Sequence, residues 1–111
     1  MLRKFEFVIP LSLQDSFELI RKSGYDVRSW QTKKSDVENG YLEWKQHLWS
    51  FTGSAVIAAH LQQRKENRTS VEISVHKPFQ VLDPLGLCNR IFNKLDKAYK
   101  KNLKELKNQA G

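Results

Sequence analysis

The sequence predicts an α+β fold: a five-stranded antiparallel sheet (β-α-β-β-β-β-α) with two helices packed on one face and a long C-terminal helix. Alternating apolar and polar residues in several short segments are typical of half-buried strands. Apolar residues recur at helical spacing near the start and at the end of the chain. Of its 111 residues, 40% are hydrophobic and 28% are charged, so a single domain is expected over residues 3–108.

The first strand and the first helix are expected before residue 25. In "RKFEFVIP" the apolar residues Phe5, Phe7 and Ile9 occupy alternate positions, and Pro10 ends the strand. Ser12 and Asp15 then form a predicted capping box for a helix in "LQDSFELIRKSG". Gly24 is expected just past the end of this helix, where glycine tolerates a left-handed backbone.

Four strands are expected next, because segments with strand character alternate with turn signals. Asn39-Gly40 is the strongest of these signals. An irregular link leads to the last helix. The strands are "DVRSWQTK", "YLEWKQHL", "AVIAAHLQQR" and "VEISVHKP", and the link is "QVLDPLGLCN". Two helices with one apolar stripe each can cover only one face of such a sheet, so the other face is expected to be open.

The aromatic run "YLEWKQHLW" is interpreted first as a strand, not as a ligand platform. Leu42, Trp44 and Leu48 fall on one face, which is apolar enough to belong to the core. The alternate positions are mixed and polar, as on a solvated face. The candidate interaction residues of the open face are Trp30, Tyr41, Lys45 and Trp49.

All three histidines are expected on this open face. His47, His60 and His76 belong to three successive strands and point away from the core in the predicted alternation. Three imidazoles at suitable distances would bind a divalent metal ion. No pattern of carboxylates accompanies them, so exposed histidines without a metal are the favoured interpretation, and no cofactor is expected.

The net charge of +7 is concentrated at the C-terminus. Residues 90–109 carry seven basic and two acidic side chains, which supply +5 of the +7. Lys94, Lys97, Lys101 and Lys104 recur at spacings of three and four, so they fall on one helical face. A solvated face is the favoured interpretation, and a phosphate-contacting stripe for nucleic acid is the alternative.

Catalytic motifs are not recognisable in the sequence. There is no nucleophile elbow, no glycine-rich phosphate loop and no His-Glu pair at metal-ligand spacing. Cys88 is the single cysteine, which excludes an internal disulfide and indicates a small buried apolar residue. The sequence therefore predicts that the protein is not an enzyme.

No signal peptide and no membrane span is expected, and the cytoplasm is the expected compartment.

The element order and the junction "VLDPLGLCNRIFNKL" resemble small bacterial stand-alone domains of unknown function. These have a fold like half of the TATA-binding-protein saddle, which is related in outline to the helix-grip fold of START and polyketide-cyclase proteins. The resemblance spans roughly residues 3–106, and Leu82, Asp83 and Gly86 are its motif-like positions. It implies either a partner on the open sheet face or a small apolar ligand between the long helix and the sheet.

The leading hypothesis is a non-enzymatic binding domain that associates with another protein, or with itself, through the open sheet face. The first alternative is weak binding of nucleic acid or another polyanion by the last helix. The second is a small hydrophobic ligand between that helix and the sheet, in a cavity lined by Phe17, Trp44, Leu95 and Tyr99. The identity of the partner does not follow from the sequence.

Overall fold

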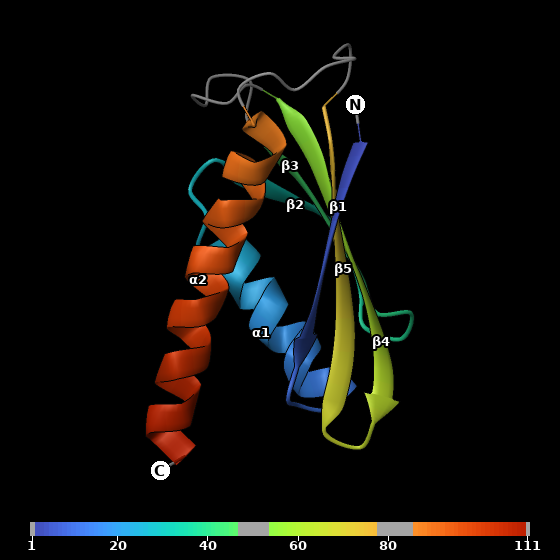
Figure 1. The fold of residues 1–111 in the computed structure, drawn as a ribbon, viewed down its shortest axis with the longest axis vertical. Coiled ribbons are helices and arrows are strands. Elements are labelled where there is room, and N and C mark those ends of the chain that lie inside the picture. Colours follow the sequence, from blue (N-terminus) through green and yellow to red (C-terminus); the bar gives the residue numbers. More distant parts are fainter. Residues whose placement is uncertain (1, 47–53, 78–85, 111) are drawn as a thin grey trace.

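A computed structural model of the chain describes residues 2–46, 54–77 and 86–110 (Figure 1). The elements are β1 (Leu2–Ile9), α1 (Leu13–Tyr25), β2 (Trp30–Asp36), β3 (Tyr41–Gln46), β4 (Ala55–Lys65), β5 (Arg68–His76) and α2 (Leu87–Ala110). They form a five-stranded antiparallel sheet in the order β1-β5-β4-β3-β2. Both helices lie on the same side of this sheet (Figure 1), which confirms the predicted fold class.

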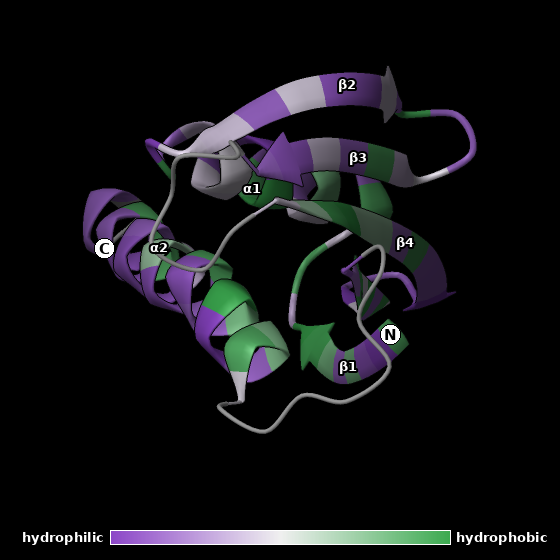
Figure 2. Cartoon of the chain, turned by 90° about the horizontal axis from the view of Figure 1, so that it is seen from above, coloured by the Kyte–Doolittle hydropathy of each residue, from purple (hydrophilic) through white to green (hydrophobic). Residues whose placement is uncertain are grey.

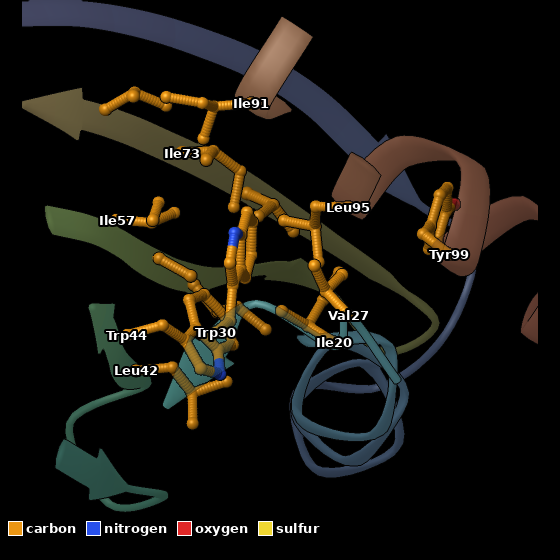
Figure 3. Close-up of a cluster of buried hydrophobic side chains, with 14 of the residues drawn as sticks. Ile20, Val27, Trp30, Leu42, Trp44, Ile57, Ile73, Ile91, Leu95 and Tyr99 are labelled. Atoms are coloured by element: carbon orange, nitrogen blue, oxygen red, sulfur yellow. The ribbon is translucent and has the colours of Figure 1, made fainter. Parts of the chain in front are cut away.

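The core lies between the inward face of the sheet and the two helices (Figure 3). Alternation along the strands supplies the sheet side, with Leu42, Ile57 and Ile73 fully buried. The helical stripes supply the other side, with Ile20 and Leu95 fully buried. In Figure 2, hydrophobic residues concentrate in the first half of α2, whereas its C-terminal half is mostly hydrophilic. The first half of α2 is therefore the part that closes the core.

Helix α1 begins as predicted but ends later. Ser12 is its N-cap, and the Ser12 side chain accepts a hydrogen bond from the backbone N–H of Asp15 at 3.3 Å. Gly24 lies inside the helix, not beyond it, and the C-cap is Asp26 in a right-handed conformation. The glycine is needed for space, because its backbone packs against the indole of Trp44.

The prediction that Trp30 lies on the open face is wrong. Trp30 is only 7% exposed and belongs to the hydrophobic core. The register of β2 against β3 shifts between Thr32 and Lys34, which leaves Lys33 as an extra residue. Such a bulge reverses the alternation of side chains along the strand. Trp30 is consequently opposite Gln46, on the same face as the buried Trp44.

The turn between β2 and β3 has the predicted position. Gly40 has a φ of +62°, a left-handed conformation that glycine adopts at low cost. The Asp36 carboxylate accepts hydrogen bonds from the backbone N–H and the side-chain amide of Asn39.

Within the described ranges, neither helix is long and apolar enough to cross a membrane.

Candidate functional site

The open sheet face carries Tyr41 and Lys45 as predicted, whereas Trp49 lies outside the described residues. The Tyr41 hydroxyl donates a 2.6 Å hydrogen bond to the Glu43 carboxylate. Its ring meets the His60 imidazole edge-on, with centroids 4.8 Å apart. The hydrogen bond to Glu43 and partial burial raise the pKa of Tyr41 to about 12. This phenol is therefore a protonated hydrogen-bond donor at neutral pH.

The histidines of the open face are not brought together. His60 is opposite Glu72 on β5, while His76 on the same strand is opposite Val56. Four residues of strand separate these positions, about 13 Å. His47 lies outside the described residues. Among the residues that the structure describes, no group of side chains could hold a metal ion.

The four lysines of the predicted stripe have different surroundings. Lys97, Lys101 and Lys104 are exposed, whereas Lys94 is half-buried. Lys94, Lys97 and Lys101 line an open groove of about 770 Å³, which Lys104 does not line. The stripe is therefore not one uniform solvated surface.

Lys94 is directed toward a polar cluster at the edge of the core. Its Nζ lies 3.2 Å from the Oε1 of Gln46 and 3.4 Å from the Oγ of Ser29. The same Gln46 oxygen accepts a 3.1 Å hydrogen bond from the Nε1–H of Trp30. Gln46 is fully buried, because alternation along β3 places it on the face of Leu42 and Trp44. Lys94 therefore contacts the edge of the core at the buried side-chain amide of Gln46, which occupies a position on the apolar face of β3.

This environment favours the uncharged amine. Burial lowers the pKa of Lys94. Both oxygens near Nζ are neutral, and no carboxylate in the described part of the chain lies within ion-pair distance of it. An opposite charge would have favoured the ammonium form. A lowered pKa increases the fraction of the lysine amine that is unprotonated at neutral pH, and the unprotonated amine is the nucleophilic form.

The cluster was not predicted as a unit. The sequence pattern predicts Lys94 only as part of the basic stripe and predicts no role for Ser29 or Gln46. One signal was present in the sequence: Gln46 follows Leu42 and Trp44 at the spacing of two that marks the core side of a strand. A polar residue in that position needs a buried partner.

The side chains expected to line an apolar cavity form the core itself. Phe17, Trp44, Leu95 and Tyr99 are all buried in one hydrophobic cluster. The rings of Trp30 and Trp44 pack at a centroid distance of 5.5 Å within this cluster. Two indoles thus occupy the space between the sheet and the helices (Figure 3).

The sequence matches no family model and no curated protein. Several solved structures have a similar fold. An uncharacterized protein from Bacillus thuringiensis shares 14% identity at a TM-score of 0.64, over 89% of this chain and 96% of that one. The Zhui aromatase/cyclase from Streptomyces sp. R1128 shares 9% identity at a TM-score of 0.65, over 100% of this chain and 96% of that one. Norcoclaurine synthase from Thalictrum flavum shares 10% identity at a TM-score of 0.62, over 95% of both chains.

The fold is therefore related to the helix-grip fold. At these identities the likeness shows the fold alone. It nevertheless corrects two expectations. The predictions of a non-enzymatic binding domain, and of no enzyme, are overturned because an aromatase/cyclase and norcoclaurine synthase share this fold. The lack of recognised catalytic motifs in the sequence was not sufficient to exclude catalysis.

Proposed function

We propose that the protein is an enzyme of helix-grip type that uses the amine of Lys94 on a small carbonyl compound. The observation that carries the proposal is the position of Lys94 Nζ, half-buried at the edge of the core and held by two neutral oxygens, those of Gln46 and Ser29. Its lowered pKa gives the neutral amine a larger share of the population at physiological pH.

The reaction proposed for this amine is imine formation. The lone pair of Nζ adds to the carbonyl carbon and forms a C–N bond. One proton moves from nitrogen to oxygen to give a carbinolamine. The second N–H proton is then lost as the protonated hydroxyl leaves as water, and a neutral C=N bond remains. Gln46 Oε1 accepts a hydrogen bond from the amine and so orients its lone pair, while the Ser29 hydroxyl is a donor close enough to meet the carbonyl oxygen.

The substrate is proposed to be small and aromatic. Trp30 and Trp44 fill the interior between the sheet and the helices. The carbonyl group would therefore approach Lys94 from outside, through the open groove that Lys94 lines. One norcoclaurine synthase structure of similar fold, with a TM-score of 0.61, is a complex with dopamine and hydroxybenzaldehyde. An aromatic aldehyde of this size is therefore a suitable first probe.

The test is reductive trapping. The protein is incubated with 4-hydroxybenzaldehyde and sodium cyanoborohydride at neutral pH, and the modified lysines are located by peptide mass mapping. Lys94 is expected to be labelled well before the exposed lysines, and Lys94→Arg is expected to lose this fast phase. Lys100→Arg is the matched control, because Lys100 is exposed and paired with Asp96 at 2.9 Å on the same helix. Equal labelling of Lys94 and Lys100 would refute the proposal.

A further inference from the structure

We infer that the substrate of the Lys94 site carries an anionic group, which Lys97 and Lys101 hold in the groove beside α2. This inference rests on the amine chemistry proposed above. The groove runs along α2 and is closed on its other side by the end of α1 and the residues after it. Its lining includes the lysines Lys94, Lys97 and Lys101 of α2, the acids Asp26 and Glu105, and the apolar Val27.

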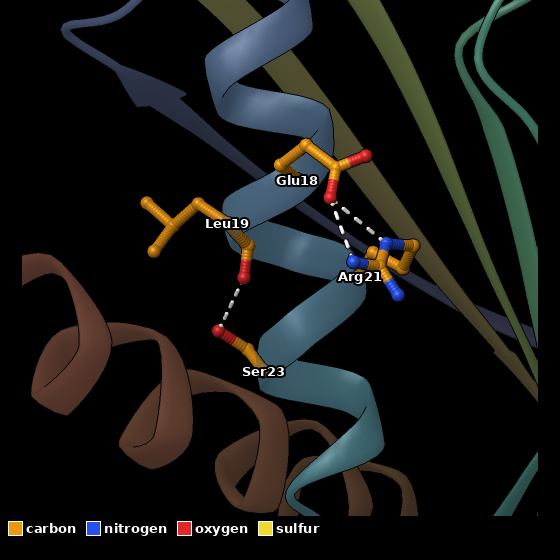
Figure 4. A network of polar contacts seen from close by, with 4 residues as sticks. All are labelled: Glu18, Leu19, Arg21 and Ser23. Carbon is orange, nitrogen blue, oxygen red and sulfur yellow. Dashed lines mark hydrogen bonds and ion pairs between the residues drawn. The ribbon is translucent and has the colours of Figure 1, made fainter.

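The two acids of the groove already have partners. Asp26 accepts a 3.0 Å hydrogen bond from the side-chain amide of Asn102. Glu105 lies 4.0 Å from the ammonium of Lys22. The same Asn102 amide also donates to the hydroxyl of Ser23 at 3.2 Å. Figure 4 shows Ser23 on the side of α1 that faces α2. These contacts join α1 to α2 and leave no acid of the groove without a partner.

Unlike the two acids, Lys97 and Lys101 of α2 line the groove without a side-chain partner in the described part of the chain. Lys97 and Lys101 have no ion-pair partner among the described residues, whereas Lys100, one position away, is paired with Asp96. The groove is lined by more basic than acidic side chains, because Lys97 and Lys101 add to Lys22 while Asp26 and Glu105 are the two acids, and this excess provides a local positive potential. An anion that enters the groove meets this potential without displacing an internal partner.

The spacing along α2 sets the geometry of the ligand. At 1.5 Å per residue, Lys97 lies about 4.5 Å and Lys101 about 10 Å along the helix axis from Lys94. Val27 and Ala98 supply apolar surface in the same groove. A compound with a carbonyl group at one end, an aromatic or alkyl body, and an anionic group at the other end fits this order of side chains.

The experiment compares three aldehydes in reductive trapping at Lys94: benzaldehyde, 4-carboxybenzaldehyde and 4-formylphenyl phosphate. Each rate is divided by the rate of the same aldehyde with Nα-acetyl-lysine, which removes differences in intrinsic reactivity. The anionic aldehydes are expected to react about fivefold faster relative to benzaldehyde, a size typical of exposed charge contacts. The faster of the two distinguishes a carboxylate from a phosphate ligand.

Two double variants decide whether the groove is responsible. Lys97→Gln/Lys101→Gln is expected to lower the anionic preference, which is the rate with an anionic aldehyde divided by the rate of the same variant with benzaldehyde, to about one. Lys100→Gln/Lys104→Gln removes the same charge outside the groove and is expected to keep the preference. An equal loss of the anionic preference in both double variants would overturn the inference, because it would show that the preference depends only on the net charge of the protein.

A second measurement separates this inference from the proposed chemistry. Benzoate and phenyl phosphate are titrated into ¹⁵N-labelled protein, and amide shifts are followed. Shifts around residues 97–101 that Lys97→Gln/Lys101→Gln removes, without trapping at Lys94, would support the groove and refute the amine chemistry. Trapping at Lys94 without such shifts and without an anionic preference would support the amine chemistry and refute the anion-binding groove.

Discussion

The indole of Trp44 on β3 lies directly against the backbone of Gly24 on α1. A Cβ atom at position 24 would lie 2.5 Å from the Nε1 and Cζ2 atoms of this ring. The Trp44 side chain is fully buried, and its ring also packs against the ring of Trp30 at a centroid distance of 5.5 Å. The Nε1–H of Trp44 has no hydrogen-bond acceptor among the described residues. Close packing of ring on backbone therefore sets the distance between α1 and the sheet.

Gly24→Ala is predicted to destabilise the protein. Alanine in a helix is favoured over glycine by about 1 kcal/mol, which alone would increase stability. Overlap with a fixed ring costs more, since overpacking of a core typically costs about 1–3 kcal/mol. The net free energy of unfolding, measured by urea denaturation, is expected to decrease.

The control for this prediction is the double-mutant cycle with Trp44→Phe. A smaller ring gives the new methyl group space, so Gly24→Ala is expected to cost less in the Trp44→Phe background. Equal effects of Gly24→Ala in both backgrounds would show that the ring contact does not determine the cost.

Trp30→Ala is predicted to leave a cavity and to destabilise the fold by about 3–5 kcal/mol, as for other buried large-to-small changes. Binding of indole from solution is expected to restore part of the lost thermal stability, because it fills the cavity. Trp30→Phe is the matched control, which keeps an aromatic ring but removes the hydrogen bond to Gln46. A change within about 0.5 kcal/mol for Trp30→Ala would instead indicate an exposed side chain.

The error for Trp30 shows how far the sequence predicts this fold. Strand alternation correctly placed Leu42 and Trp44 in the core and Tyr41 on the open face, because burial depends on a period of two. It failed for Trp30, since the extra residue Lys33 reverses the parity and leaves no mark in the pattern. Register shifts depend on pairing with the neighbouring strand, which a single strand does not encode.

The candidate site was less predictable for a related reason. Ser29, Gln46 and Lys94 come from three separate segments, and only the packing of α2 against the sheet brings them together. The helical spacing of Lys94 groups it with exposed lysines. Its depressed pKa is a property of the tertiary environment, so composition and periodicity gave no signal for it.

Tyr41→Phe is predicted to change the alkaline dependence of stability. The pKa of Tyr41 is about 12 in the folded protein, above its ordinary value of 10. Between these values the unfolded chain loses the phenolic proton while the folded chain keeps it, so stability falls as pH rises through this window. Tyr41→Phe is expected to reduce that fall, measured as urea midpoints from pH 9 to 12.

Glu43→Gln is the accompanying variant, because the hydrogen bond to Glu43 is the largest cause of the raised pKa of Tyr41. It is expected to lower this pKa toward 10, seen as an earlier tyrosinate absorbance in a spectrophotometric titration. Parallel stability curves for the wild type and Tyr41→Phe would contradict the assignment.

Gln46→Glu is predicted to raise the pKa of Lys94 and to suppress its reactivity at neutral pH. The substitution keeps an oxygen about 3.2 Å from Nζ but makes it part of a carboxylate. An opposite charge at this distance favours the ammonium form, so it opposes the desolvation that lowers the pKa in the wild type. The pH profile of reductive trapping at Lys94 is expected to move to higher pH. Gln46→Met, which removes the acceptor without adding charge, is not expected to move the profile in that direction. If both variants shift the profile upward equally, the neutral oxygen at Gln46 is not what keeps the amine reactive.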